Sequence, residues 1–369
     1  MKIKIAEIAD IHFGVSSAHT IRTFENLEKN FIGWLKKNNP DVNIIAICGD
    51  LFHLKLSLNS TEAKMAIGFI DRLVSEFPNA RIILIKGTRS HDLDQLEILS
   101  SRCNENFKIY NTVCDDYYGK DFHYLVIPEE YYPDKSVYDK YLKTTERYDW
   151  GFFHGLFTFA GSYALQNNVK IHKISFNSKE FDNVVIGKMV GGHIHMPMEE
   201  NKVQYCGSFG RWKHGEEEDK GFRYHEYDTT TKQILKDDFI VNNDTFIYKT
   251  LSISLFDLDN LEHLIKQIHD EAIKCTALRI KAFKTDVITE SQASNLVAAC
   301  IQFSNVSIYK EVKNVDKVVS DEDKKLSEER KQRIKEYEGL SFNEITIKYA
   351  NEVLHKNITD KQISEILSV

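Results

Sequence analysis

The sequence lacks long uncharged apolar runs, C-x-x-C pairs and any excess of positive charge. Its longest apolar stretches are interrupted by charges before they reach membrane length, so we expect no transmembrane helix and no role in a membrane. The opening residues, 1–10, alternate as a strand does and show neither the apolar region nor the cleavage site of a signal peptide. The six cysteines are scattered, and Cys48 falls inside an apolar run, which favours free thiols. These absences favour a cytoplasmic protein.

The charge balance bears on the partners that the protein could bind. The chain of 369 residues has a net charge of −7, whereas proteins that bind nucleic acid are usually basic on the binding face. Any binding to a polyanion would therefore need local basic patches, metal ions or a partner chain to supply the positive field. The length leaves room for two domains or more.

Polar residues follow a series of short apolar runs. The central run, Ile44 to Cys48, has the pattern of a strand buried on both faces, and Gly49, Asp50 and His53 follow it. Because open α/β sheets hold their ligands at the carboxyl ends of strands, we expect one polar centre along one sheet edge. The other runs and the residues that follow them are 3–9 with Asp10 and His12, 81–86 with Gly87, Ser90, His91 and Asp92, 150–153 with His154, and 184–190 with His193 and His195.

Amphipathic helices are predicted between these runs, at 20–37 and 61–76, and the alternation predicts an α/β fold with right-handed crossovers. The first helix should bury one face, formed by Ile21, Phe24, Leu27, Phe31, Trp34 and Leu35. From 107 to 220 the strands shorten and the loops lengthen, which indicates a mixed sheet, and two further strands are predicted at 222–227 and 234–240.

Changes in composition divide the chain into four parts, at 1–242, 243–313, 314–339 and 340–369. The second part has a βαβαβ pattern over 248–309, with helices at 258–274 and 290–303, and lacks a catalytic-looking cluster, so we interpret it as an accessory domain. The third is densely charged with both signs and is predicted to be a solvated linker or an exposed helix. The last should form two capped helices with apolar stripes, at Phe342, Ile345, Tyr349 and Val353, and at Ile363, Ile366 and Leu367.

The residues at the strand ends have the chemistry of a metal site. Carboxylates and imidazoles together suit Mn²⁺, Fe²⁺ or Zn²⁺ and are ill-suited to Ca²⁺. There are more candidates than one ion can use, so a dinuclear centre is the economical interpretation, with Asp50 of the central strand as the bridge. The candidate ligands are Asp10, His12, Asp50, His154, His193 and His195.

In these motifs the chain resembles the calcineurin-like metallophosphoesterases. Their series D-x-H, G-D-x-x, G-N-H-[DE], an isolated His and G-H-x-H is matched over roughly 1–240 by Asp10-Ile-His12, Gly49-Asp50-Leu-Phe-His53, an altered third motif, Phe153-His154-Gly155 and Gly192-His193-Ile-His195. The GDLFH form and the later run Tyr205-Cys-Gly-Ser-Phe-Gly-Arg211 resemble the SbcD-type DNA repair exonucleases, the meiotic recombination eleven family, including members of phage type.

The resemblance implies a fold, a reaction and partners. The fold would be a metallophosphoesterase sandwich, with helices flanking two mixed β-sheets, a smaller α+β capping domain and C-terminal helices that bind an SbcC-type coiled-coil ATPase. The reaction would be hydrolysis of DNA phosphodiester bonds in end processing, recombination or repair, with two Mn²⁺ ions or with Mg²⁺, Zn²⁺ or Fe²⁺ in their place. It would take place in the cytoplasm of a bacterial or phage-infected cell, or in the nucleus of a eukaryote, and a homodimer is compatible with it.

The resemblance also implies a role for each residue. Asp10, His12 and His195 would bind one ion, and His154 and His193 the other, with Asp50 between them. His91, supported by Asp92, would protonate the leaving oxygen, and His53 would contact the scissile phosphate.

The third motif departs from the family pattern. Gly87-Thr-Arg-Ser-His91-Asp92 lacks the metal-binding Asn, and we expect the hydroxyl of Ser90 to be a weaker ligand in its place. Arg211 and Lys213 are candidate phosphate contacts or part of a surface turn, and the acidic residues 216–219 should point away from DNA or act as a gate.

Two other functions stay open: a phosphodiesterase for a small nucleotide or phosphoprotein, and a non-catalytic DNA-end scaffold. Folding of the C-terminal helices onto the first domain is the alternative to a partner.

Overall fold

A computed structural model describes residues 1–129, 135–166, 175–282 and 289–309. Residues 1–309 group into one compact unit. The predicted charged segment 314–339 and the predicted helices in 340–369, together with the boundary at 313, lie outside the described residues. Within the described part of the chain, no helix is long and apolar enough to cross a membrane.

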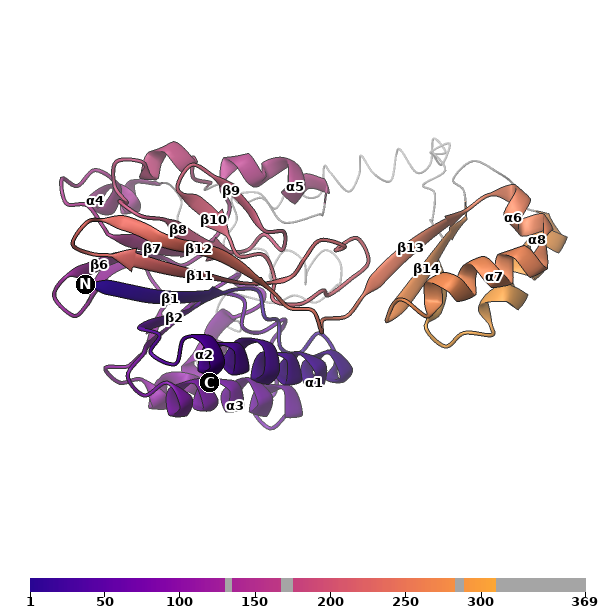
Figure 1. The fold of residues 1–369 in the computed structure, drawn as a ribbon, viewed down its shortest axis with the longest axis horizontal. Helices are drawn as coiled ribbons and strands as arrows, with labels where there is room; N and C mark the ends of the chain where they lie inside the picture. Colours follow the sequence, from indigo (N-terminus) through magenta and orange to yellow (C-terminus); the bar gives the residue numbers. More distant parts are fainter. Residues whose placement is uncertain (130–134, 167–174, 283–288, 310–369) are drawn as a thin grey trace, which may run out of the picture. The chain divides into compact units, whose positions relative to one another are not determined.

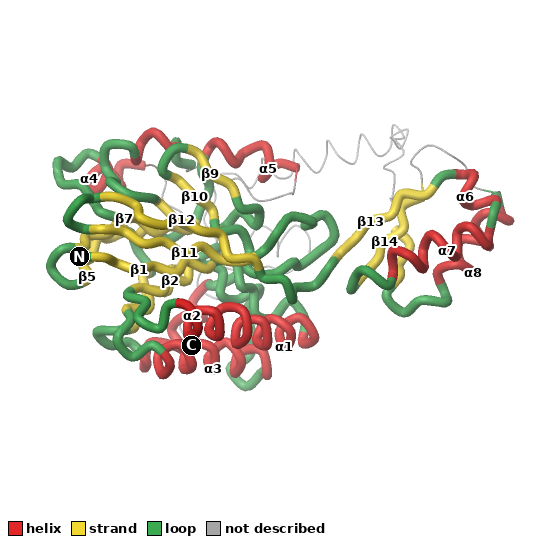
Figure 2. The backbone as a smooth tube through the Cα atoms, in the orientation of Figure 1, coloured by secondary structure: helices red, strands yellow, loops and turns green. Residues whose placement is uncertain are grey.

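The first sheet is mixed and has six strands, with helices over one face (Figures 1 and 2). Its order is β12 (Gln233–Val241), β11 (Gly221–Asp228), β1 (Lys2–Ile8), β2 (Ile44–Cys48), β3 (Arg81–Ile85) and β4 (Phe107–Tyr110). Strands β1 to β4 are mutually parallel, and β11 and β12 run antiparallel to their neighbours. The helical layer consists of α1 (Ser17–Asn26), the π-helical η1 (Leu27–Ile32), α2 (Gly33–Asn38) and α3 (Thr61–Glu76).

The helix predicted at 20–37 is present but is interrupted by a π-helical segment, η1. The i→i+5 bonds of such a segment widen the turn and rotate the apolar stripe. Leu27, Phe31 and Leu35 are buried as expected, but Ile21 is 45% exposed, and the buried face of α1 is formed by Thr20, Thr23 and Asn26 instead. The placement of Ile21 on the buried face was therefore wrong.

The second sheet is also mixed and has six strands. Its order is β5 (Cys114–Tyr118), β6 (Phe122–Ile127), β7 (Trp150–His154), β8 (Met189–Gly192), β10 (Val203–Tyr205) and β9 (Met198–Glu200). The strand predicted at 184–190 begins only at Met189, because the chain bends at 186–187 before it. Short helices η3 (Lys135–Tyr138), α4 (Asp139–Leu142), η4 (Thr158–Ala160), α5 (Gly161–Gln166) and η5 (Ser178–Phe181) contribute to the core on its other face, and η2 (Leu93–Arg102) lies next to β4 along the chain.

The two sheets share a core, which contains Ile5 and Ile44 from the first sheet and Phe122, Tyr124 and Trp150 from the second. Burial of this apolar surface is the main force that holds the sheets together. The prediction of an α/β fold is confirmed. The polar strand ends, however, come from both sheets, so the expectation of a single sheet edge is corrected: the polar centre lies where the ends of two sheets meet.

The described residues of 248–282 and 289–309 form a smaller sheet with its own core. Its strands β13 (Tyr248–Ile253), β14 (Ala277–Ala282) and β15 (Val306–Tyr309) are parallel. Helices α6 (Leu255–Asp259) and α7 (Leu261–Ala272) lie between β13 and β14 in the chain, and α8 (Glu290–Cys300) precedes β15. The single helix predicted at 258–274 is two helices, because the side chain of Asn260 caps α7 through the His263 N–H. The predicted capping box of Thr289 and Gln292 is confirmed.

Candidate metal centre

The backbone is strained where the predicted ligands lie. Among the described residues, only six other than glycine have a positive φ, and four of them are Asp10 (51°), His12 (57°), Asp50 (50°) and His193 (94°). Such conformations cost about 1–3 kcal/mol each and persist only where the surrounding structure enforces them, typically at functional sites. The fold therefore holds these four side chains in their orientations at a cost in folding free energy.

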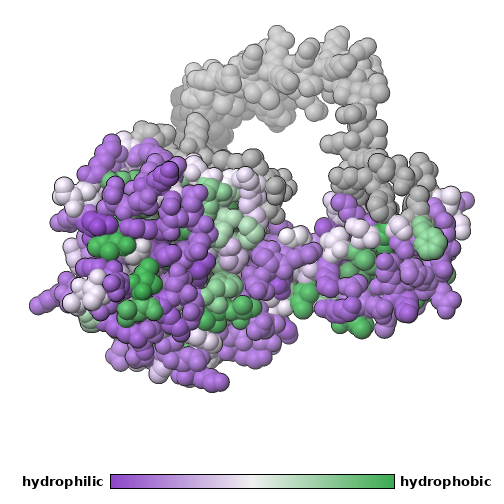
Figure 3. Space-filling view, turned by 45° about the horizontal axis from the view of Figure 1, so that its top comes forward, coloured by the Kyte–Doolittle hydropathy of each residue, from purple (hydrophilic) through white to green (hydrophobic). Residues whose placement is uncertain are grey.

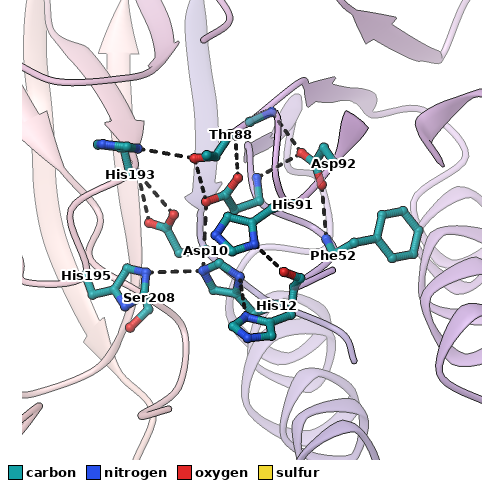
Figure 4. A network of polar contacts seen from close by, with 12 residues as sticks. Asp10, His12, Phe52, Thr88, His91, Asp92, His193, His195 and Ser208 are labelled. Atoms are coloured by element: carbon teal, nitrogen blue, oxygen red, sulfur yellow. Dashed lines mark hydrogen bonds and ion pairs between the residues drawn. The ribbon is translucent and has the colours of Figure 1, made fainter. Parts of the chain in front are cut away.

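Asp10, His12 and His195 form the first group of potential ligands. The Nε2 atoms of His12 and His195 lie 3.1 Å apart, a separation that two imidazoles can have when each lies about 2.0–2.1 Å from one ion. Figure 4 shows these residues converging from the ends of β1 and β8. The group has the three members that the resemblance implied.

Glu129, His154 and His193 form the second group. The Glu129 carboxylate lies 3.1 Å from His193 Nδ1 and 3.5 Å from His154 Nε2, and all three residues are buried. The sequence analysis missed Glu129. A signal was present, because the apolar run of β6 is followed by Pro128 and Glu129, as the other strands are followed by Asp or His.

Asp50 lies between the two groups. Its Oδ2 is 3.9 Å from His12 Nε2 and 3.3 Å from His154 Nε2, and Asp10, Asp50 and His154 themselves form a potential ligand group. Burial opposes ionisation of Asp50, but His154 and His12 outweigh it and hold the pKa of this carboxyl well below its usual range. The position between the groups is the one that a bridging carboxylate requires.

Thr88, and not Ser90, is the residue of the third motif whose side chain lies among the candidate ligands. The Thr88 hydroxyl donates to Asp50 Oδ2 at 3.1 Å or to Glu129 Oε2 at 3.0 Å, and it lies 3.3 Å from a nitrogen of both His154 and His193. Figure 4 shows the contact between Thr88 and His193. Its backbone N–H donates to Asp50 Oδ1 at 2.6 Å. Ser90 is exposed, because the chain turns at 88–92 and 90 lies on the outer side of that turn. The expectation of a Ser90 ligand is corrected accordingly.

Outer hydrogen bonds orient two of the imidazoles. His154 Nδ1 lies 2.8 Å from the Cys48 carbonyl oxygen, and His195 Nδ1 lies 2.9 Å from Glu216 Oε1. If each Nδ1 carries the proton and donates it there, Nε2 faces the centre with a free lone pair, as metal-binding histidines require. Burial opposes ionisation of Glu216, but His195 and Lys220 hold its pKa at about 2. Glu216 therefore points inward, whereas Glu217 and Asp219 of the same acidic loop are exposed.

His53 and His91 lie beside the first group, with ring centroids 5.2 Å and 4.8 Å from that of His12, and both are half-buried. His91 Nδ1 contacts the carbonyl oxygen of His53. Asp92 does not support His91: its carboxylate accepts the backbone N–H groups of Asp50, Phe52 and Gly87 (Figure 4). The predicted role of Asp92 is therefore corrected to fixing the backbone beneath Asp50.

The two predicted phosphate contacts differ in their surroundings. The Arg211 guanidinium donates to the carbonyl oxygens of Phe246, Glu217 and Glu218, so it ties the loop 216–218 to the chain near 246. This placement favours the surface-turn interpretation of Arg211. Lys213 is exposed.

The donor set fits a pair of divalent ions. Asp10, Asp50 and Glu129 place three buried carboxylates in one site, and such charges are costly without cations or hydrogen-bond partners. One ring nitrogen of His193 is buried without a hydrogen-bond partner among the described residues. Mixed imidazole and carboxylate donors suit Mn²⁺, Fe²⁺ or Zn²⁺.

Comparisons with known proteins give little further information. No family model and no curated protein matches the sequence. One similar solved structure is GAP50, described as the anchor in the inner membrane complex of Plasmodium, at 13% identity and a TM-score of 0.35 over 65% of this chain and 89% of that one. A second has 12% identity and a TM-score of 0.33 over 65% of this chain and 100% of that one. Likeness at this level carries no argument about function.

Proposed function

We propose that the protein is a calcineurin-like metallophosphoesterase of the SbcD type, a nuclease that hydrolyses DNA phosphodiester bonds with two divalent ions. The observation that supports this most is the pair of buried ligand groups on either side of Asp50. The arrangement of two mixed sheets with outer helices also suits the metallophosphoesterase sandwich. The order of the motifs in the sequence supports the narrower assignment to the SbcD type.

Asp10, His12 and His195 would hold one ion, and Glu129, His154 and His193 the other. Two bound ions clamp a phosphate and lower the pKa of an attacking water. The chain's own histidines then handle the substrate: His91, half-buried beside the first group, would deliver a proton to the leaving oxygen, and His53 would contact the phosphate.

Two alternatives remain to be separated by experiment. A phosphodiesterase for small nucleotides or phosphoproteins would use the same centre, but it would give no role to residues 243–369. A non-catalytic DNA-end scaffold would follow from a lost metal, yet the carboxylate of Glu129 supplies a donor where the Asn is absent. We propose the nuclease over both.

The test is cleavage of end-labelled single-stranded and duplex DNA and of a generic phosphodiester, with Mn²⁺ or Mg²⁺. Asp50→Ala should keep the fold and abolish turnover on every substrate, because it removes the residue between the ligand groups and with it several kcal/mol of transition-state stabilisation. A folded variant that keeps more than about a tenth of the turnover would contradict this. Asp41→Ala, at an exposed aspartate paired with Lys4, is the matched control and should be unchanged.

Each other outcome selects an alternative. Turnover of the generic phosphodiester without cleavage of DNA would favour the small-substrate enzyme. DNA binding without metal uptake or turnover would favour the scaffold. Full activity of a folded Asp50→Ala variant would contradict the bridging role.

A further inference from the structure

We propose that a cavity beside the metal centre binds a nucleobase of the DNA strand that is cut. This inference rests on the proposed nuclease function and adds a substrate subsite to it. The cavity has a volume of about 640 Å³, within the usual range for small-molecule sites. Its lining includes Phe159, Ser162, Tyr163, Met196, Met198 and Glu218.

The cavity adjoins the ligands of the metal centre. Met196 directly follows His195, and Glu218 lies two residues after Glu216, whose carboxylate is 2.9 Å from His195 Nδ1. Burial raises the pKa of the Tyr163 hydroxyl, and the carboxylates of Glu218, Glu216 and Asp10 raise it further. A group in this cavity would therefore be close to a phosphate held at the metal centre.

The walls suit a flat, polarisable ring. Phe159, Tyr163, Met196 and Met198 are half-buried and pack against the core of the second sheet, so their positions are fixed from behind. Aromatic rings stack on nucleobases, and methionine sulfur contacts aromatic rings favourably. These side chains belong to η4, α5, the segment after β8, and β9, which is the edge strand of the second sheet.

Charge argues for a base and against a phosphate in this cavity. Glu218 is the charged side chain among the lining residues, and its Oε1 accepts a hydrogen bond from Lys220 Nζ at 2.8 Å, so the carboxylate is held in place. A carboxylate repels a phosphate but accepts N–H donors from a base edge, and the Ser162 hydroxyl can donate or accept. On the face drawn in Figure 3, hydrophobic side chains gather in small patches on a mostly hydrophilic surface.

The test combines protein variants with loss of a base. The substrate is a short oligonucleotide with one abasic nucleotide placed in turn at positions near the cleaved bond, compared with intact DNA. At the position bound in the cavity, removing the base should lower kcat/KM of the unmodified protein roughly 5- to 150-fold, which corresponds to the usual contribution of one stacked base. Tyr163→Leu and Phe159→Leu should cause a loss of similar size on intact DNA and little further loss on the abasic DNA.

Tyr117→Leu is the matched control, because Tyr117 is 46% exposed and stacks on His123 away from this cavity. Tyr117→Leu should change kcat/KM by the same factor on intact and on abasic DNA. Metal content should stay the same in all three variants, which shows that the fold survives. As a second measurement, 2-aminopurine at the sensitive position should lose fluorescence on binding to the unmodified protein and retain more of it with Tyr163→Leu.

The outcomes separate this inference from the function on which it rests. If Tyr163→Leu lowered kcat/KM by the same factor on intact and on abasic DNA, the subsite would be overturned. Equal cleavage of intact and abasic DNA by the unmodified protein at all positions would also overturn it. In both cases the nuclease function would stand. Failure of the unmodified protein to cut either DNA would overturn the proposed function itself.

Discussion

At the scale of single residues, the centre depends on donors that come from strand ends far apart in the sequence. Glu129 supplies a carboxylate to His154 and His193, and the Thr88 hydroxyl lies among the same side chains. Ser90, the residue expected to replace the Asn, is exposed. The second ion should therefore depend on Glu129 and be indifferent to Ser90.

The prediction is that Glu129→Gln loses affinity for one of two Mn²⁺ ions by roughly 10- to 100-fold, because an ionised carboxylate is replaced by a neutral amide. Titration calorimetry and metal analysis measure the stoichiometry and affinity. Ser90→Ala is the matched control and should bind both ions as the unmodified protein does. Equal effects of the two changes would contradict this assignment of the second group.

At the scale of elements, the strands approach so closely at the centre that only glycine fits between them. A Cβ at Gly87, just after β3, would lie 2.2 Å from the backbone nitrogen and Oδ1 of Asp50. Gly87→Ala should push Asp50 aside, cost about 1–3 kcal/mol of folding free energy and reduce Mn²⁺ affinity. Gly68→Ala in α3, where the nearest atom is 3.8 Å away, should instead be neutral or stabilising by up to about 1 kcal/mol. Thermal unfolding and metal titration of both variants decide between these expectations.

A buried ion-pair network joins the two sheets away from the metal centre. His225 of β11 lies 3.0 Å from Glu7 Oε2 of β1 and 3.0 Å from Asp237 Oδ1 of β12, and Trp150 Nε1 of β7 donates to Glu7 at 3.1 Å. Burial lowers the pKa of His225, but Glu7 and Asp237 outweigh it and raise this pKa to about 9. Because the folded-state pKa exceeds the unfolded value of about 6.5, the stabilisation is complete below about pH 6.5 and is lost as the pH rises through about 9.

We therefore predict that His225→Asn is most destabilising near pH 6 and that the difference from the unmodified protein shrinks by about 3 kcal/mol by pH 9.5. Urea unfolding of both proteins at a series of pH values measures this difference. His263→Asn, at an exposed histidine of α7, is the control and should show no comparable trend. A difference in unfolding free energy that grows as the pH rises would be opposite to this prediction and would contradict a charged His225.

At the scale of the whole molecule, the net charge of −7 has to be reconciled with a polyanionic substrate. Bound cations would offset part of this charge at the centre, and a partner could supply the rest. We propose that the tail, which lies outside the described residues, recruits an SbcC-type ATPase through its predicted apolar stripes.

Deletion of Asp321–Val369 should abolish association with such an ATPase and leave metal content and turnover of a generic phosphodiester unchanged. Co-purification and size-exclusion chromatography with the ATPase measure the association. Unchanged association would contradict the tail's role as the partner site. A large fall in the unfolding temperature of the truncated protein would favour the alternative that the tail folds onto the first domain.

The sequence by itself determined the local elements and most of the candidate metal ligands. Strand β2 and helix α3 have the predicted bounds, because a continuous apolar run and a 3.6-residue period are local signals. Six candidate ligands could be identified because each lies just after an apolar run with the pattern of a strand: Asp10, His12, Asp50, His154, His193 and His195.

Only the tertiary structure decided how these residues combine. Pairing within each sheet and packing between the two sheets bring β6 to the centre, which adds Glu129, and they turn Glu216 inward onto His195. The turn at 88–92 selects Thr88 over Ser90. These outcomes depend on contacts between residues far apart in the chain, and a pattern read along one segment carries no information about which distant segment will pack against it.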